Sequence, residues 1–136
     1  MKIWSATILF LGSFTLVACR NSWPCTDQNV LAKVKELFDQ QEFGQLMPIP
    51  TKVFRVQHRT ATSIKTGHDN DGNRCSVVVT SDVIEMTRFT EQATEEEIVR
   101  IKQEAAKRNF PLTKDYLTQY VVQPLASGEH YVTLLR

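Results

Sequence analysis

The sequence predicts an α+β fold in which an N-terminal helix packs on a curved antiparallel sheet of about four strands, with an inserted peripheral helix. Three observations support this prediction. An apolar stripe with helical spacing runs through residues 26–43. Two long β-rich runs follow it, 51–66 and 74–89, and a last alternating region covers 116–135. A helix start signal at Thr94 separates the second run from that last region.

The first predicted helix begins after Thr26 or Asp27, because either side chain can accept hydrogen bonds from the first amides of a helix. It continues to Phe43 and ends at Gly44, since glycine readily adopts the left-handed conformation that closes many helices. One face of this helix is apolar: Val30, Val34, Leu37 and Phe38. We expect this face in the core rather than on a binding partner, because a domain of this size needs the stripe inside.

Pro48 and Pro50 separate this helix from the first β-rich run. One alternation phase of that run, residues 51–66, contains Phe54, Val56, Thr60, Thr62 and Ile64. The second run, 74–89, is apolar around Cys75, and its apolar phase shifts near Ser81 and Asp82. The shift predicts a bulge or bend in one long strand that curves around the helix.

The loop 67–73 between these runs reads Gly-His-Asp-Asn-Asp-Gly-Asn. We interpret it as a hairpin loop, because these residues tolerate positive φ. Calcium binding is the alternative. However, the glycine directly follows Asp71, and no glutamate occupies the closing position of an EF-hand loop.

Thr94 and Glu97 have the spacing of a capping box, which predicts a second helix that runs to about Arg108. Glutamates fill its first turn and basic residues its last, as the helix dipole favours. Few of its side chains are apolar: Ile98, Val99, Ile101 and Ala105. We therefore expect a helix that lies on the surface as an insertion.

The rest of the chain is typical of a hairpin. Residues 116–122 alternate, Pro124 to Gly128 predicts a turn, and 130–135 return as a β-rich strand. A short helix over 113–120 is the alternative for the first of these strands.

The N-terminus has the pattern of an export signal. Lys2 precedes an uncharged apolar run, residues 3–17, which is shorter than the roughly 20 residues that span a bilayer. The run ends in Leu16-Val17-Ala18-Cys19, and Leu16 is too large for ordinary signal peptidase. These four residues resemble the lipobox of bacterial lipoproteins. A retained anchor and cleavage at another site are the alternatives.

The resemblance implies a lipoprotein signal peptide over 1–18 and a lipidated tether over 19–24, with palmitate among the acyl chains on Cys19. Cleavage would leave 118 residues, which are enough for one domain and too few for two, and we place this single domain at 25–136. More than one acyl chain is needed for stable anchoring. Arg20 is not the aspartate associated with inner-membrane retention. The resemblance therefore implies the outer membrane of the cell envelope, with the domain facing the periplasm.

The cysteines fit an oxidising compartment. The chain has three of them, and giving Cys19 to lipid leaves Cys25 and Cys75 as one pair. We expect a disulfide between these two residues. No metal site is predicted, because the cysteines and histidines are scattered.

The predicted order of elements is similar to that of cystatin-like and NTF2-like domains, in which a curved antiparallel sheet wraps one N-terminal helix. That resemblance places Cys25 before the helix and Cys75 on the second strand, where they would join helix to sheet. The Gln-x-Val-x-Gly loop of true cystatins is absent, because Gln123 is followed by Pro124 and Leu125. Protease inhibition by that loop is therefore not expected.

The net charge and the absence of certain motifs argue against several classes of function. The chain has 16 basic and 15 acidic residues, and loss of Lys2 would balance them, which argues against nucleic acid as a partner. No glycine-rich phosphate loop is present, and the histidines lack a catalytic context. We predict no cofactor and no enzyme activity. The prediction is a membrane-anchored envelope lipoprotein that binds an envelope protein or a cell-wall component. The alternative is a protective binder: an inhibitor, an immunity protein or a plasmid-exclusion lipoprotein.

Three tyrosines are candidate partner-binding residues. Tyr116 and Tyr120 share one phase of the predicted hairpin, and Tyr131 lies on its returning strand. Tyrosine combines a large contact area with a hydrogen-bonding tip. The alternative is that these rings cover an edge of the core.

Overall fold

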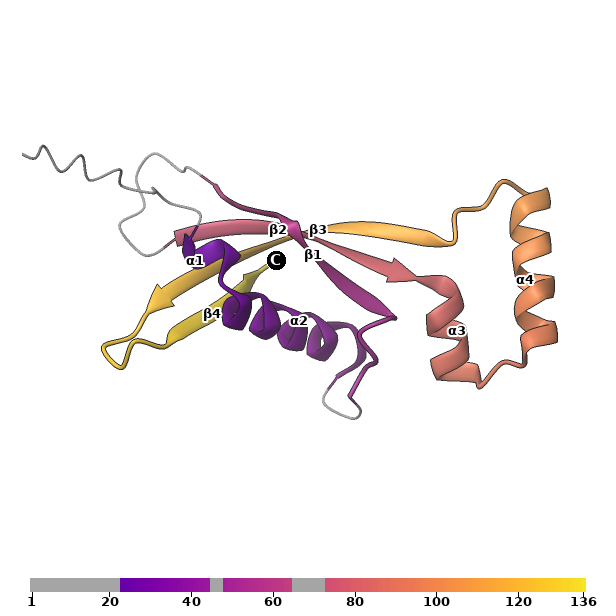
Figure 1. Ribbon diagram of the computed structural model, residues 1–136, viewed down its shortest axis with the longest axis horizontal. Helices are drawn as coiled ribbons and strands as arrows, with labels where there is room; N and C mark the ends of the chain where they lie inside the picture. Colours follow the sequence, from indigo (N-terminus) through magenta and orange to yellow (C-terminus); the bar gives the residue numbers. More distant parts are fainter. Residues whose placement is uncertain (1–22, 45–47, 65–72) are drawn as a thin grey trace, which may run out of the picture.

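The computed structural model describes residues 23–44, 48–64 and 73–136, and it has the predicted α+β architecture. In chain order the elements are α1 (Trp23–Thr26), α2 (Gln28–Phe43), β1 (Phe54–Ser63), β2 (Asn73–Asp82), α3 (Val83–Glu91), α4 (Glu95–Lys107), β3 (Thr113–Pro124) and β4 (His130–Leu135). The strands form one four-stranded antiparallel sheet in the order β1-β2-β3-β4, with α2 against one face (Figure 1). All but the last residue of the predicted loop 67–73 lies outside the described residues, as do the predicted signal peptide and the tether up to residue 22.

Helix α2 begins where the sequence predicts. The carboxylate of Asp27 accepts hydrogen bonds from the amides of Asn29 and Val30 at 2.9 and 3.1 Å. The helix ends at Gly44, whose φ is 74° and whose N–H donates to the carbonyl of Gln40. Its buried side chains form one stripe: Val30, Leu31, Val34 and Phe38. The stripe predicted from the spacing is confirmed, with Leu37 only partly buried at its edge.

The main core lies between α2 and the inward face of the sheet. Inward positions alternate along each strand and are buried: Val77, Val79, Tyr120, Val122 and Val132. The ring of Phe38 on α2 packs edge-on against Phe54 on β1, with centroids 5.0 Å apart. Full burial of such an apolar side chain contributes roughly 1.5–3 kcal/mol. This single layer therefore accounts for much of the stability of the domain.

Two bonds fasten α1 to the two central strands of the sheet, near the start of β2. The sulfur atoms of Cys25 and Cys75 are 2.01 Å apart, which is the distance of a disulfide bond. The pair predicted from the cysteine count is therefore present. The hydroxyl of Tyr120, which lies opposite Cys75 on β3, donates a hydrogen bond to the carbonyl oxygen of Cys25 at 2.7 Å. All three residues are fully buried. A disulfide with a sequence separation of 50 stabilises a fold by about 4 kcal/mol on the chain-entropy estimate.

Strand β1 is shorter than predicted and contains the bulge of the sheet. Gln57 pairs with Val78 and Thr62 with Ser76, so that residues 58–61 stand opposite the single residue Val77. The hydroxyl of Thr60 occupies this break, because it donates to the carbonyl of Gln57 at 2.7 Å and accepts the amide of Val78 at 2.8 Å. The bulge shifts the alternation, so the prediction of one phase from Phe54 to Ile64 was wrong.

The second β-rich run is not one long strand. Strand β2 ends at Asp82, and Val83–Glu91 form α3. The prediction of a strand as far as Phe89 was therefore wrong. The carboxylate of Asp82 caps α3 by accepting a hydrogen bond from the amide of Glu85 at 3.1 Å. The shift in apolar phase marks the junction between strand and helix rather than a bulge.

Helix α4 confirms the predicted capping box. The hydroxyl of Thr94 accepts the amide of Glu97 at 3.3 Å, and the Glu97 carboxylate accepts the amide of Thr94 at 2.7 Å. Helices α3 and α4 stand together at one end of the molecule, away from α2 (Figure 1). Their buried side chains lie outside the main core: Ile84, Ile98 and Ala105. We call this projecting unit, residues 83–112, the arm.

The C-terminal hairpin forms as predicted from β3 and β4. The alternative of a helix over 113–120 was wrong, because residues 113–122 of β3 pair with β2 without a break. The turn closes at Gly128, whose φ is 84° and whose amide donates to the carbonyl of Leu125 at 3.0 Å.

Replacing Tyr120 with phenylalanine should destabilise the domain by about 1–3 kcal/mol, because the buried carbonyl of Cys25 would lose its donor. Burial also raises the pKa of Tyr120 from 10.0 to about 12. A raised pKa favours the neutral hydroxyl in the folded state, so its stabilisation is complete below pH 10 and is lost as the pH approaches 12.

Urea unfolding from pH 8 to 12 measures both effects. The wild type should lose more stability above pH 10 than Tyr120→Phe does. Tyr131→Phe is the matched control, because Tyr131 is 58% exposed and should behave as wild type. The same pH dependence in all three proteins would contradict this role of Tyr120.

Candidate functional site

One face of the sheet is covered by no described helix, and we call it the open face. Its side chains belong to the alternation phase opposite to that of the core. They include Arg55, Gln57 and Thr62 on β1; Arg74, Ser76, Val78 and Thr80 on β2; Asp115, Leu117, Gln119, Val121 and Gln123 on β3; and Tyr131, Thr133 and Leu135 on β4.

A diagonal apolar band crosses the open face: Val78, Leu117, Leu135, Val121 and Tyr131. Leu117 pairs directly with Val78 across β2 and β3. Leu135 is paired with Gln119, which makes it a diagonal neighbour of Leu117. Val121 lies diagonally between Leu135 and Tyr131 in the same way. Leu117 is 68% exposed and Tyr131 is 58% exposed, so the band is open to solvent at its most prominent side chains.

The part of the open face nearest β1 is polar and internally bonded. The Gln57 amide donates to the hydroxyl of Thr80, which donates in turn to the Asp115 carboxylate at 2.6 Å. Thr80 is buried even though it lies on the open face. This chain of hydrogen bonds across three strands fixes the side chains beside the apolar band.

The structure does not bring the three candidate tyrosines together. Tyr120 is in the core and has no accessible surface to offer a partner. Tyr116 is half-buried on the inward face, with its ring 5.9 Å from that of Phe38. Tyr131 alone of the three lies on the open face. Leu117, in the opposite phase to Tyr116, is 68% exposed and was not among the candidates predicted from the sequence.

The predicted lipidation site, Cys19, lies outside the described residues. The described chain begins at Trp23 in α1, which the disulfide of Cys25 holds against the sheet. Among the described elements, no helix is both long enough and apolar enough to cross a membrane.

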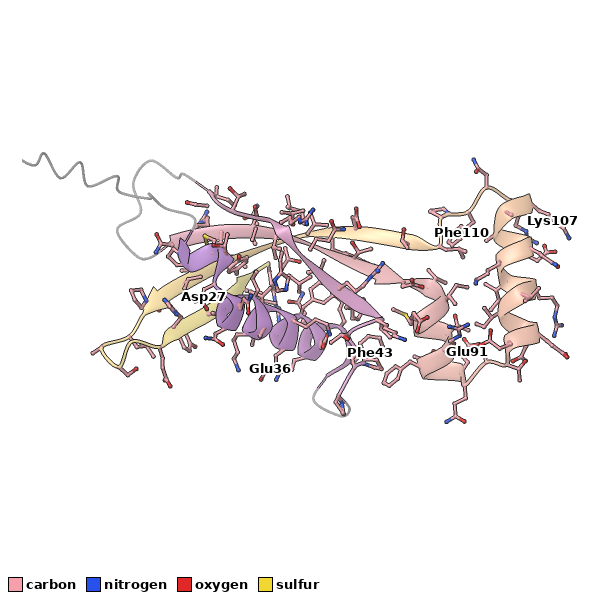
Figure 2. All side chains as sticks on the ribbon, viewed as in Figure 1. Asp27, Glu36, Phe43, Glu91, Lys107 and Phe110 are labelled. Carbon is pink, nitrogen blue, oxygen red and sulfur yellow. A yellow bond between two sulfur atoms is a disulfide. The ribbon has the colours of Figure 1, made fainter. Side chains whose placement is uncertain are left out.

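The arm contains an open groove of about 570 Å³ between α3 and α4. Its apolar lining comes from both helices and from the segment that leads into β3: Val83, Ala93, Ile101, Ala105, Phe110 and Leu112. Phe110 lies beside the C-terminal end of α4, and Glu91 lies at the end of α3 (Figure 2). Phe110 is 61% exposed, so the groove is not filled by the arm itself.

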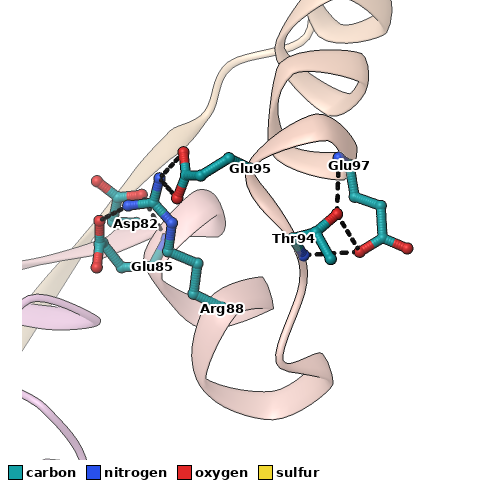
Figure 3. A network of polar contacts seen from close by, with 6 residues as sticks. All are labelled: Asp82, Glu85, Arg88, Thr94, Glu95 and Glu97. Atoms are coloured by element: carbon teal, nitrogen blue, oxygen red, sulfur yellow. Dashed lines mark hydrogen bonds and ion pairs between the residues drawn. The ribbon is translucent and has the colours of Figure 1, made fainter.

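Arg88 ties the two helices of the arm together (Figure 3). Its guanidinium lies 3.0 Å from the carboxylate of Glu85 on α3 and 3.0 Å from that of Glu95 on α4. Glu85 is itself held at the start of α3, where Asp82 caps its amide. The ion pairs of Arg88 therefore link α3 to α4, in addition to the small apolar core of the arm.

The described groups with shifted pKa values do not form a catalytic pair. Burial raises the pKa of Asp39, although its pairing with Lys35 opposes that rise. Hydrogen bonds from Thr94 lower the pKa of Glu97. Burial in the core raises the pKa of Tyr120. Asp39 and Glu97 line different cavities, and Tyr120 lines none of those described. Within the described ranges, no group of three or more His, Cys, Asp or Glu side chains could hold a metal ion.

Comparison with known proteins found no protein family, curated protein or solved structure that matches this chain. The similarity to lipoprotein signals and to cystatin-like or NTF2-like domains therefore stays a prediction from the sequence.

Arg88→Ala should loosen the arm and leave the main core unchanged. The ion pairs are partly exposed, so we expect a loss of up to about 1 kcal/mol, or roughly fivefold faster amide exchange. Hydrogen exchange of residues 95–107 should show this change, whereas residues 28–43 should not respond. Lys107→Ala is the matched control, because it removes an ion pair that lies within α4. Equal protection of 95–107 in Arg88→Ala and wild type would show that Arg88 does not hold the arm.

Proposed function

We propose that the protein is a membrane-anchored lipoprotein of the bacterial cell envelope that binds a protein partner through the open face. It is not an enzyme in this proposal. The observation that carries it is the apolar band, in which Leu117 and Tyr131 are exposed to solvent on adjacent strands of the sheet.

The composition of the open face suits a protein partner. A continuous exposed apolar patch is a frequent mark of an interaction surface. Tyrosine is enriched in such surfaces, and the neighbouring glutamines, Gln119 and Gln123, can supply hydrogen bonds at the rim. Small-molecule sites are concave, whereas the band runs across the outward face of a sheet. A broad partner surface fits this shape better than a small ligand does.

The anchor would place this surface near a membrane. The lipobox-like sequence ends at Cys19, and the first described helix begins at Trp23. An extended chain spans at most about 3.3–3.6 Å per residue, so these few residues give the domain only a short reach from the anchor. The domain would therefore work close to the membrane surface, where its partner must also be accessible.

Cys19→Ala tests the anchor. Lipid labelling should be lost and the protein should be released from the membrane fraction or be misprocessed, because the acylated sulfur is absent. Metabolic labelling with a palmitate analogue, fractionation and intact mass measure these effects. Unchanged labelling and membrane partition would contradict the proposal.

The partner surface is tested by substitutions within the band. A photo-crosslinking residue at position 117 identifies the partner in intact cells, and binding is then measured with the purified pair. Leu117→Thr and Tyr131→Thr should each weaken binding at least about tenfold. Each should change folding stability by no more than about 0.5 kcal/mol, because exposed positions tolerate substitution.

Leu125→Thr is the matched control, because Leu125 is 46% exposed but lies in the hairpin turn, outside the band. It should bind as wild type. Unchanged affinity in both band variants, or crosslinks to cell-wall fragments instead of a protein, would show that the open face is not a protein-binding surface.

A further inference from the structure

The groove of the arm lies between α3 and α4 and is open to solvent. Its floor is apolar, with Ile101 and Ala105 on α4 and Val83 on α3. Phe110 stands at one end and is 61% exposed. A helical hairpin with one apolar groove left open is half of a four-helix bundle, because such a bundle buries the grooves of two hairpins against each other.

The rim of the groove on α4 carries charges of alternating sign. Along the helix the order is Glu97, Arg100, Glu104 and Arg108, and all four line the groove. At about 100° per residue these charges and Ile101 fall within roughly a third of the helix circumference. Charge rows beside an apolar seam determine which helices pair and in which orientation.

This charge order is complementary to itself when the helix direction is reversed. In an antiparallel pair centred near position 102, Glu97 would face Arg108 of the second copy, and Arg100 would face Glu104. A two-fold axis would form each of these pairs twice. The same sequence placed parallel would put like charges opposite each other.

The rim charges interact with one another within one copy, but at exposed positions. The amide of Thr94, which the Glu97 carboxylate accepts, and the charge of Arg100 both help to lower the pKa of Glu97. Arg100 makes no ion pair with any residue that the structure describes. Glu104 lies 2.8 Å from Lys107 and 3.9 Å from Arg108, but all three side chains are more than half exposed. Exposed pairs of this kind contribute little to stability, so these carboxylates can change partners at low cost.

We infer that the arm is a homodimer interface, in which α4 of one copy packs antiparallel on α4 of a second copy and the two arms form a four-helix bundle. The partner is a second copy because the rim charges match their own reversed order. Phe110 of each copy would be covered by the second arm. This interface is separate from the open face and does not depend on the lipid anchor.

Charge reversal with rescue tests this inference. Arg100→Glu and Glu104→Arg should each raise the dissociation constant of the dimer at least about tenfold, since each puts like charges together at two places. The double variant should restore dimerisation, because both pairs then form with their signs exchanged. Lys102→Glu is the matched control, since Lys102 lies on α4 outside the groove lining, and it should dimerise as wild type.

Sedimentation velocity of the full chain in density-matched detergent gives the dissociation constants. Circular dichroism confirms that α4 is folded in every variant. The wild type is measured over a series of concentrations up to about millimolar, and a monomer throughout that series would overturn the inference. A double variant that dimerises as weakly as the single variants would also overturn it. Neither result would affect binding through the open face, which is measured with Leu117→Thr and Tyr131→Thr.

Discussion

The attachment of α1 to the two central strands, near the start of β2, is the constraint on which the rest of the domain depends. Cys25 is bonded to Cys75 on β2, and its carbonyl accepts the hydroxyl of Tyr120 on β3. These two bonds determine where α2 begins and therefore which face of the sheet it covers. A chain of this length has one helix of sixteen residues with which to cover four strands. Only one face can then be buried, and the alternation of each strand assigns the remaining side chains to the open face.

The same constraint separates the arm from the core. The inward face is filled by α2 and by the aromatic contacts of Phe38, so α3 can place only part of its surface against the core, through Met86 and Phe89. Helix α4 instead buries Ile98 and Ala105 within the arm, outside the main core. The arm therefore has a minor core of its own, two ion pairs at Arg88 and an open groove.

The two proposed surfaces would bind through different interactions, apolar contacts on the open face and ion pairs beside an apolar groove on the arm. The open face is a β surface with Leu117 and Tyr131 as prominent side chains, and its polar part is fixed by hydrogen bonds through Thr80. The arm groove is bordered by a charge row that favours one orientation of one partner. Under the two proposals together, the sheet would contact an envelope protein while the arms join two copies on the same membrane.

The sequence alone determined the elements whose start and end signals are local. Asp27 and Gly44 bounded the first helix, Thr94 and Glu97 started α4, and the cysteine count predicted the disulfide pair. Helix α3 was missed although Asp82 is a local N-cap candidate of the same kind as Asp27. The β-branched residues Val83 and Ile84 that follow Asp82 continue the apolar β-rich run and concealed the start of the helix.

Tertiary structure also decided the exposure of the tyrosines and of Leu117. The sequence showed that Tyr116 and Tyr120 share a face of β3 and that Leu117 has the opposite phase. It did not show which face α2 would cover, because a strand alternates equally well in either orientation. The disulfide and the Tyr120 hydroxyl place that phase inward, which buries Tyr120 and exposes Leu117. Strand patterns give the period of burial, whereas contacts between distant segments choose the buried side.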